Sequence, residues 1–174
     1  AGELTPAVFH VSAQSNVMQG LSILGDHSDV MAVRSTGFAM LFGNTPQEVM
    51  DLGLIAHAST LKSRIPFLNI FDGFRTGIEL NNVKVLPDEV IGQMMDLEAL
   101  HAFRGRALNH SASSIQMDTA QSREAASKYY DNIHNLVQES MDQFYTLTGR
   151  RYNIYEYYGH NHPDRIIVVM GSGA

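Results

Sequence analysis

The stretch Pro66–Phe71 (PFLNIF) runs directly into Asp72–Thr76 (DGFRT), and this junction is the strongest fold signal in the chain. A short, mainly apolar run has the length of a buried strand, and its leading proline cannot continue a preceding helix. The run ends at Gly73, which follows an acid and stands two residues before a base, Arg75. In open α/β sheets, ligands bind at the carboxyl ends of strands, so this turn is the first candidate site.

Two upstream runs, Ala7–Ala13 and Phe38–Phe42, are short and rich in β-forming residues, which predicts two more strands. A helix start signal follows the second run: Thr45 as the cap, Pro46 at the first helical position and Glu48 three residues after the cap. A strand, a helix and a strand joined by short links predict a parallel crossover unit. We therefore expect an α/β fold, a three-layer sandwich with a mainly parallel sheet.

The downstream half predicts mostly helix. Residues 88–107 are expected to be helical in two pieces that break near Asp96, and residues 107–122 are expected to form an exposed loop. Apolar residues at helical spacing predict a long amphipathic helix from about residue 133 that stops at Gly149. Arg165–Met170 is expected to be a last buried strand, followed by a tight turn at Gly171–Gly173.

Composition and charge restrict the class of protein. The chain has 174 residues, of which 44% are hydrophobic and 17% charged, so it fits one domain better than two. A formal net charge of −6 argues against a nucleic-acid partner, and no apolar run approaches the ~20 residues that span a bilayer. The absence of cysteine excludes disulfides and thiolate-bound metal within these residues. We expect a cytoplasmic chain without a membrane partner, and the missing initiator methionine suggests a piece of a longer protein.

Two glycine-containing blocks carry the candidate chemistry. Asp26 and His27 follow Gly25 and are either an acid–base pair or the side chains that hold a turn. Asp72 and Arg75 flank the second turn, where the arginine either binds an anion or forms an internal ion pair. We expect an acidic side chain or backbone carbonyls to hold Arg75, and Gly73 to adopt a backbone angle that penalises a β-carbon.

Histidines elsewhere do not predict a metal site. His160 and His162 stand near Asp164, but nothing fixes a coordination geometry, so they are interpreted as surface residues. His57 lies among apolar helix positions and is interpreted as a satisfied core or face residue. The chain contains no Gly-x-Ser-x-Gly motif that would indicate a hydrolase.

Several blocks of the chain resemble the pyruvate:ferredoxin (flavodoxin) oxidoreductase family. In chain order they are Phe9–Ala13, Leu21–Arg34, Thr36–Leu41, Phe71–Thr76, Arg123–Ala126, Leu147–Arg150 and Val169–Ser172. The resemblance covers nearly the whole chain. It implies the later part of the first domain, the pyrimidine-side thiamine diphosphate domain, over residues 1–164, incomplete at its N-terminus. Residues 165–174 would be the first strand and turn of the following domain.

The resemblance also implies a reaction. Members of this family oxidatively decarboxylate pyruvate with coenzyme A and pass electrons through iron–sulfur clusters to ferredoxin or flavodoxin. Thiamine diphosphate would be shared with other domains of a homodimeric parent, and magnesium and the clusters would be held outside this segment. No catalytic residue is assigned to these 174 residues, and the isolated chain is expected to be inactive.

The resemblance further implies a substrate contact and a cofactor contact. Where the family normally places an arginine that holds the substrate carboxylate, this chain has Gln14. Leu21 and Ile23 would lie along the apolar side of the cofactor. An amide offers hydrogen bonds but no charge to a carboxylate. The glutamine therefore keeps an alternative open: a catalytically silent paralogue, or a structural or docking module of a larger assembly.

Overall fold

The sheet is parallel and its central strand is the one that the sequence marks most strongly. The computed structural model describes residues 4–15, 26–109 and 127–174. Within them, strands β1 (Val8–Ala13), β2 (Ala39–Phe42) and β3 (Phe67–Asp72) form one sheet in the order β1-β3-β2. Both pairings are parallel. Phe67 and Ile70 are fully buried, as expected of a central strand covered on both faces.

Helix α2 (Pro46–Ser63) links β2 to β3 and begins as the sequence predicts. The Thr45 side chain accepts a hydrogen bond from the Glu48 backbone N–H at 3.3 Å, and Glu48 Oε2 accepts one from the Asn44 backbone N–H at 2.8 Å. The helix ends at Arg64, whose left-handed φ of 62° lets its N–H bond to the Thr60 carbonyl. The predicted strand–helix–strand unit is confirmed.

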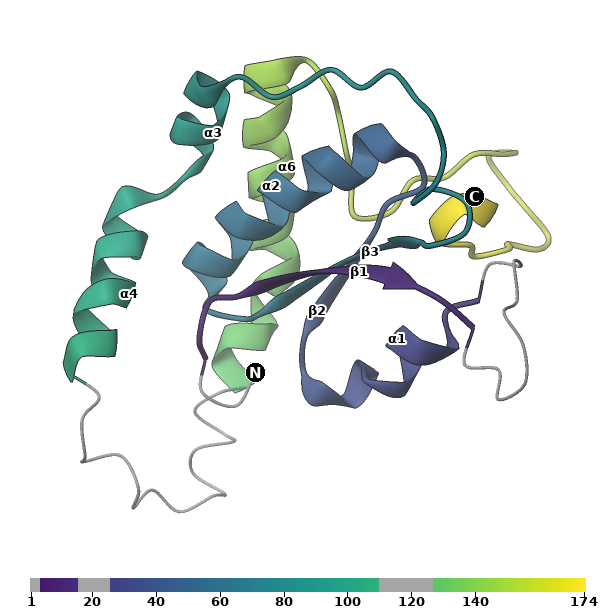
Figure 1. Cartoon of the computed structure of the whole chain (residues 1–174). Coiled ribbons are helices and arrows are strands. Elements are labelled where there is room, and N and C mark those ends of the chain that lie inside the picture. Colours follow the sequence, from purple (N-terminus) through teal and green to yellow (C-terminus); the bar gives the residue numbers. More distant parts are fainter. Residues whose placement is uncertain (1–3, 16–25, 110–126) are drawn as a thin grey trace.

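Helices cover the two faces of the sheet unequally (Figure 1). One face carries α2 together with α3 (Asp88–Met94), α4 (Leu97–Asn109) and α6 (Ile133–Thr148). On this side the buried hydrophobic core comprises Leu52, Leu54, Ile55, Ala56, Ala58, Phe67, Met94, Val137, Met141 and Phe144. The other face carries the short helix α1 (Ser28–Ala32), followed by the 3-10 turn η1 (Arg34–Thr36). There a smaller buried cluster contains Ala13, Val30, Leu68 and Ile70. The α/β architecture is therefore confirmed.

The helix boundaries in the second half also follow the sequence. Helix α3 ends at Met94 and α4 begins at Leu97, and the Asp96 carboxylate between them accepts a hydrogen bond from the Ala99 backbone N–H at 2.9 Å. Helix α6 stops at Gly149, where φ is 73° and the N–H bonds to the Tyr145 carbonyl. Most of the predicted loop at 107–122 lies outside the described residues, and its first residues belong to α4.

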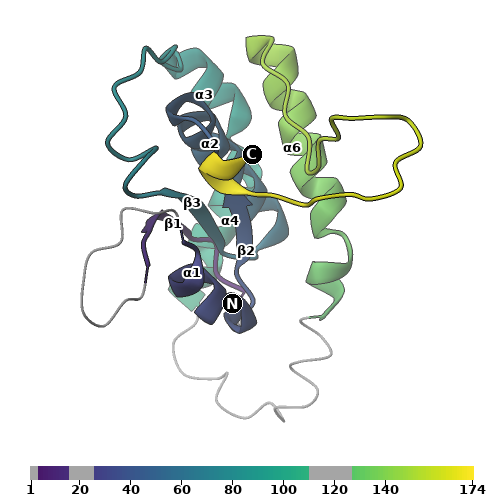
Figure 2. The same cartoon turned by 90° about the vertical axis from the view of Figure 1, so that its right-hand side faces the viewer.

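The prediction of a buried strand at Arg165–Met170 is wrong. These residues form no strand, and Ile167 and Val168 are 86% and 87% exposed. An apolar run becomes a strand only where a neighbouring strand supplies hydrogen bonds. Figure 2 shows this yellow segment as a plain coil that runs back from an outer loop toward the C-terminal turn. Its end returns at the 3-10 turn η2 (Gly171–Gly173), as predicted for a turn. The proposed domain division at 164/165 stays a prediction.

The helices described above range from the five residues of α1 to the 18 residues of α2. Within the described residues, no helix is both long enough and apolar enough to cross a bilayer.

Candidate functional site at the carboxyl edge of the sheet

The carboxyl ends of the parallel strands bring the predicted turns together. In the strand register, Ala13 at the end of β1 lies opposite Asp72 at the end of β3. Gln14 and Gly73 therefore leave the sheet side by side. The turn η2 lies at the same edge, beside the ends of the strands in Figure 1. In open α/β folds this edge is where ligands bind.

His27 pairs with Asp72, not with Asp26. The His27 Nε2 atom lies 2.6 Å from Asp72 Oδ1, and the two side chains are 17% and 5% exposed. Asp26 instead accepts a hydrogen bond from the Ser28 backbone N–H at 2.8 Å, which also lowers the pKa of the Asp26 carboxyl. Asp26 thus makes the side-chain-to-backbone contact that a turn-holding role predicts. The sequence indicated His27 and Asp72 separately but not their pairing, because they are 45 residues apart.

Both oxygens of Asp72 are occupied. While Oδ1 faces His27, Oδ2 accepts a hydrogen bond from the Ser172 backbone N–H at 2.7 Å. Burial acts to raise the pKa of Asp72, but the hydrogen bonds from Ser172 and His27 outweigh it, so that the pKa lies below its ordinary value of 3.8. Asp72 is therefore an ionised anchor that joins β3, the segment before α1 and the C-terminal turn.

Position 171 accommodates only glycine. Its φ is +72°, a left-handed conformation that favours glycine. A β-carbon there would lie 2.8 Å from Cε1 and 2.9 Å from Nε2 of His27, and 3.1 Å from Oδ2 of Asp72. The chain at Gly171 is thus packed directly onto the His27–Asp72 pair.

Gly73 is also required, but not for the predicted reason. Its φ does not lie in the left-handed region, so the expectation of a backbone angle that penalises a β-carbon is wrong. What excludes a side chain is close approach: a β-carbon would lie 2.5 Å from Ser12 Oγ and 3.0 Å from the Ala13 carbonyl oxygen. The Gly73 N–H donates to that same carbonyl at 3.0 Å.

Arg75 does not behave as predicted. Its side chain is exposed, and neither an acidic side chain nor a backbone carbonyl of the described residues holds its guanidinium. The turn that begins at Gly73 directs residue 75 outward, where water solvates the charge. Both the expected internal ion pair and the expected carbonyl contacts are therefore wrong.

Gln14 lies at this edge, exposed to solvent. Its backbone N–H donates to Asp29 Oδ2 of α1 at 2.9 Å, and its Cγ is 3.2 Å from the point where a β-carbon on Gly73 would stand. The predicted cofactor contacts Leu21 and Ile23 lie outside the described residues, so their roles stay predictions.

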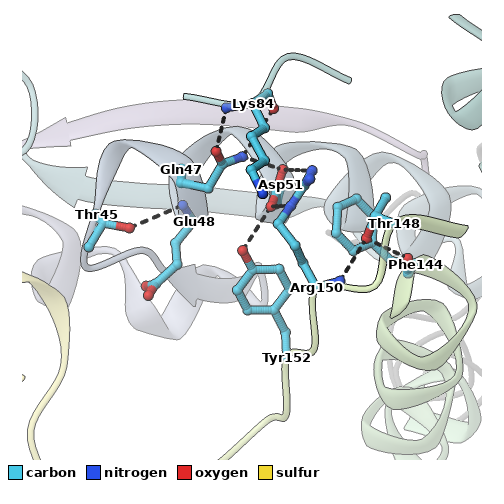
Figure 3. Close-up of polar contacts among 9 residues, drawn as sticks. All are labelled: Thr45, Gln47, Glu48, Asp51, Lys84, Phe144, Thr148, Arg150 and Tyr152. Carbon is cyan, nitrogen blue, oxygen red and sulfur yellow. Dashed lines mark hydrogen bonds and ion pairs between the residues drawn. The ribbon is translucent and has the colours of Figure 1, made fainter. Parts of the chain in front are cut away.

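A second polar cluster lies on α2 and was missed by sequence reasoning (Figure 3). Asp51 is fully buried and receives Arg150 Nε at 2.6 Å, Arg150 Nη2 at 3.0 Å and the Tyr152 hydroxyl at 2.8 Å. Gln47 Nε2 adds a fourth hydrogen bond at 3.1 Å. These hydrogen bonds raise the pKa of Arg150, while burial and then Asp51 raise that of Tyr152. The sequence does contain a signal for this cluster: Asp51 stands among apolar positions of a helix. A carboxylate buried there requires hydrogen-bond partners.

The Asp51 cluster is structural. Its carboxylate already accepts four hydrogen bonds, two on each oxygen, which leaves no lone pair for a ligand or a proton transfer. It ties the chain after α6 to the first half of α2.

Two histidines border a shallow pocket of about 530 Å³ on the β1 side. The rings of His10 and His57 are 5.9 Å apart, and burial and then the charge of His10 lower the pKa of His57. His57 is an exposed residue on the face of α2, in line with its interpretation as a core or face residue. The buried Asn69 amide donates to the Val49 carbonyl at 2.9 Å and lies 3.1 Å from His10 Nδ1. Apart from the two histidines, the residues that line the pocket are apolar or glycine.

Among the described residues, no group of three or more His, Cys, Asp or Glu side chains could hold a metal ion. His160 and His162 are exposed, and His160 Nδ1 accepts a hydrogen bond from the His162 backbone N–H at 3.1 Å. Their interpretation as surface residues agrees with this geometry.

Comparison with known proteins gives the family. The family described as "Pyruvate flavodoxin/ferredoxin oxidoreductase, thiamine diP-bdg" matches residues 1–150. Relatives include pyruvate:ferredoxin oxidoreductase of Moorella thermoacetica, 48% identical over 99% of this chain, and a probable pyruvate-flavodoxin oxidoreductase of Escherichia coli, 47% identical over 99%. The chain spans only 15% of the length of each. A pyruvate dehydrogenase [NADP(+)] of Cryptosporidium parvum is 45% identical over 99% of the chain, which spans 9% of it. The chain therefore belongs to the thiamine diphosphate-binding domain family of the pyruvate flavodoxin/ferredoxin oxidoreductases.

Proposed function

We propose that this chain is part of a thiamine diphosphate-dependent enzyme that oxidatively decarboxylates pyruvate to acetyl-CoA. Its electrons would pass to ferredoxin or flavodoxin. The observation that carries the proposal is similarity along the whole chain, 48% and 47% identity, to relatives named for pyruvate and for these acceptors. Because the chain spans 15% of those relatives, the parent's other domains would supply the remaining machinery. The parent would be a cytoplasmic homodimer, and the 174 residues alone would be inactive.

The described residues do not by themselves fit thiamine diphosphate. Its diphosphate needs a divalent cation or several cationic and N–H donors, whereas both oxygens of Asp72 are already used by His27 and Ser172. Arg75, the basic side chain of the Asp72–Thr76 turn, is exposed. This edge would form one side of a site that other domains complete. It contributes the close-packed backbone at Gly73 and the amide of Gln14. We therefore assign the diphosphate, magnesium and the iron–sulfur clusters to other domains, and derive no step through the cofactor.

Within the proposal, Gln14 contacts the substrate carboxylate, and Leu21 and Ile23 line the apolar side of the cofactor. Gln14 is exposed at the carboxyl edge, while its backbone N–H is held by Asp29. A glutamine amide donates neutral hydrogen bonds from a single nitrogen, whereas arginine would donate a charged, forked pair from two nitrogens. Charge-assisted bonds are worth roughly 1.5–3 kcal/mol, which is about one to two decades in rate or affinity.

The test uses the full-length protein that contains this chain. Pyruvate-dependent and coenzyme A-dependent reduction of a low-potential dye is measured for the wild type, for Gln14→Arg and for the control Gln93→Arg, an exposed position on α3. We expect slow turnover by the wild type and a kcat/KM raised about 10- to 100-fold by Gln14→Arg alone. If the wild type is highly active and Gln14→Arg lowers that activity, a residue other than Gln14 binds the carboxylate of the substrate.

A second candidate is a catalytically silent module of a larger assembly. The glutamine at position 14 favours it, because the charged contact to a substrate carboxylate is missing. Absence of turnover with every 2-oxo acid tested, in the wild type and in Gln14→Arg alike, would select this candidate.

A further inference from the structure

Gln14 is held from two directions. On one side its backbone N–H donates to Asp29 Oδ2 at 2.9 Å. On the other side Gly73 packs against it: the Gly73 N–H donates to the Ala13 carbonyl at 3.0 Å, and the Gln14 Cγ lies 3.2 Å from where a β-carbon on Gly73 would stand. Helix α1 and the turn after β3 therefore both determine where the Gln14 side chain begins.

These two supports are joined to each other by His27 and Asp72. His27 is the residue before α1, two positions from Asp29, and Asp72 immediately precedes Gly73. The 2.6 Å contact between His27 Nε2 and Asp72 Oδ1 thus closes a ring of contacts that starts and ends at Gln14. Without it, the segment before α1 and the end of β3 would lose their direct side-chain link.

The pair is itself locked. The second oxygen of Asp72 accepts the Ser172 N–H at 2.7 Å, which hinders rotation of the carboxylate. Gly171 packs against the His27 ring so closely that no β-carbon fits between them. The Phe42 ring lies 5.2 Å from the His27 ring, centroid to centroid, at the end of β2. Three segments hold the imidazole in one orientation.

We propose that His27 and Asp72 are positioning residues for Gln14, which they orient toward the carboxylate of a 2-oxo acid. This inference rests on the proposed function. Neither residue touches the substrate; each acts through the placement of α1 and of the Gly73 turn. Loss of the pair releases Gln14, which weakens substrate binding more than it slows the later steps.

The kinetic test compares variants of the full-length protein. His27→Ala removes the contact, Asp72→Asn removes the charge, and His27→Gln keeps an N–H donor near the position of Nε2. Asp164→Asn and His134→Ala are controls at exposed sites. We expect His27→Ala to raise KM for the 2-oxo acid about three- to tenfold with a small change in kcat and no change in KM for coenzyme A. His27→Gln should restore most of the wild-type KM. If His27→Ala does not fold, His27→Asn, which is too short to reach Asp72, replaces it.

A second measurement does not need activity. Hydrogen–deuterium exchange followed by mass spectrometry reports the Gln14 and Gly73 amides, which donate to Asp29 and to Ala13. Both should exchange faster in His27→Ala than in the wild type, while amides of α6 keep their wild-type rates. The exchange rates still test the ring of contacts around Gln14 if the wild type turns over no 2-oxo acid. Absence of turnover would count against the proposed function but not against these contacts. Variants that lower the melting temperature but leave KM and these two amides unchanged would overturn the positioning role.

Discussion

Asp51 and Arg150, 99 residues apart in the sequence, form a two-pronged ion pair in which Nε lies 2.6 Å from Oδ2 and Nη2 lies 3.0 Å from Oδ1. The Asp51 carboxylate is fully buried, while the Arg150 side chain is 22% exposed and its guanidinium lies over the Phe144 ring. Each charge therefore depends on the other, since an unpaired buried charge is strongly destabilising.

Removing one partner of this pair should destabilise the fold more than removing both. We expect Arg150→Met to lower the free energy of unfolding by about 3–5 kcal/mol, because it leaves Asp51 buried without its cation. The double variant Asp51→Leu/Arg150→Met should recover part of that loss. Urea unfolding of Asp51→Leu, of Arg150→Met and of the double variant gives the coupling energy between the two residues. Additive losses would show that the pair is not coupled.

Gly73→Ala should destabilise the domain although the φ of Gly73 is ordinary. The new methyl group would lie 2.5 Å from Ser12 Oγ and 3.0 Å from the Ala13 carbonyl oxygen, so the Ser12 side chain and the end of β1 must shift. We expect a loss of about 1–3 kcal/mol, as for other overpacked sites. Gly92→Ala is the matched control: it lies in helix α3 with open space around it and should stabilise by about 0.5–1 kcal/mol. Equal thermal midpoints for the two variants would contradict the close-approach explanation.

Asp72 should make the thermal stability of the domain depend on pH in the acidic range. Its pKa is lowered in the folded state, so its contribution is present above its ordinary value of 3.8 and is lost as pH falls through the folded-state pKa. We therefore expect the wild type to melt above Asp72→Asn at pH 7, and the difference to narrow as pH falls below about 4. Thermal melts from pH 7 to pH 2.5 check this, with Asp164→Asn as the control. A difference that stays constant over this range would contradict the linkage.

Thr45→Ala should weaken the start of α2. The Thr45 hydroxyl accepts the Glu48 N–H, one of the N–H groups that has no partner within the helix. Loss of such a cap costs about 1 kcal/mol. Thr146→Ala removes a hydroxyl that bonds within α6, to the Asp142 carbonyl, and serves as the control. Denaturant midpoints should fall for the first variant and stay near the wild type for the second.

Local signals predicted much of the fold. The cap at Thr45, the stop at Gly149 and the break near Asp96 each depend on residues within one helical turn, and all three are confirmed. The apolar run at Arg165–Met170 carries an equally strong strand signal, yet it is exposed and unpaired. A strand depends on a partner elsewhere in space, which a local pattern does not specify.

In the candidate site, too, the sequence indicated some features and not others. Asp26, His27, Asp72 and Gly73 were indicated by residue type and position, but the partner of each was not. Arg75 was expected to be held and is exposed, and Asp51 was not singled out although it has the most complete set of hydrogen bonds. Residue type tells which groups need partners, whereas distance in space decides which groups they receive.

The parallel strand–helix–strand unit, the helix ends and the family could all be predicted from the amino-acid sequence, because they depend on local periodicity, capping and matching blocks of residues. Three contacts follow only from the three-dimensional packing: Asp72 with His27 and with Ser172 at the carboxyl edge, Gly73 against the end of β1, where no side chain fits, and Arg150 with Asp51. These contacts join residues 45 to 100 positions apart. Packing of the sheet and its helices, not any local preference, brings them within hydrogen-bond distance.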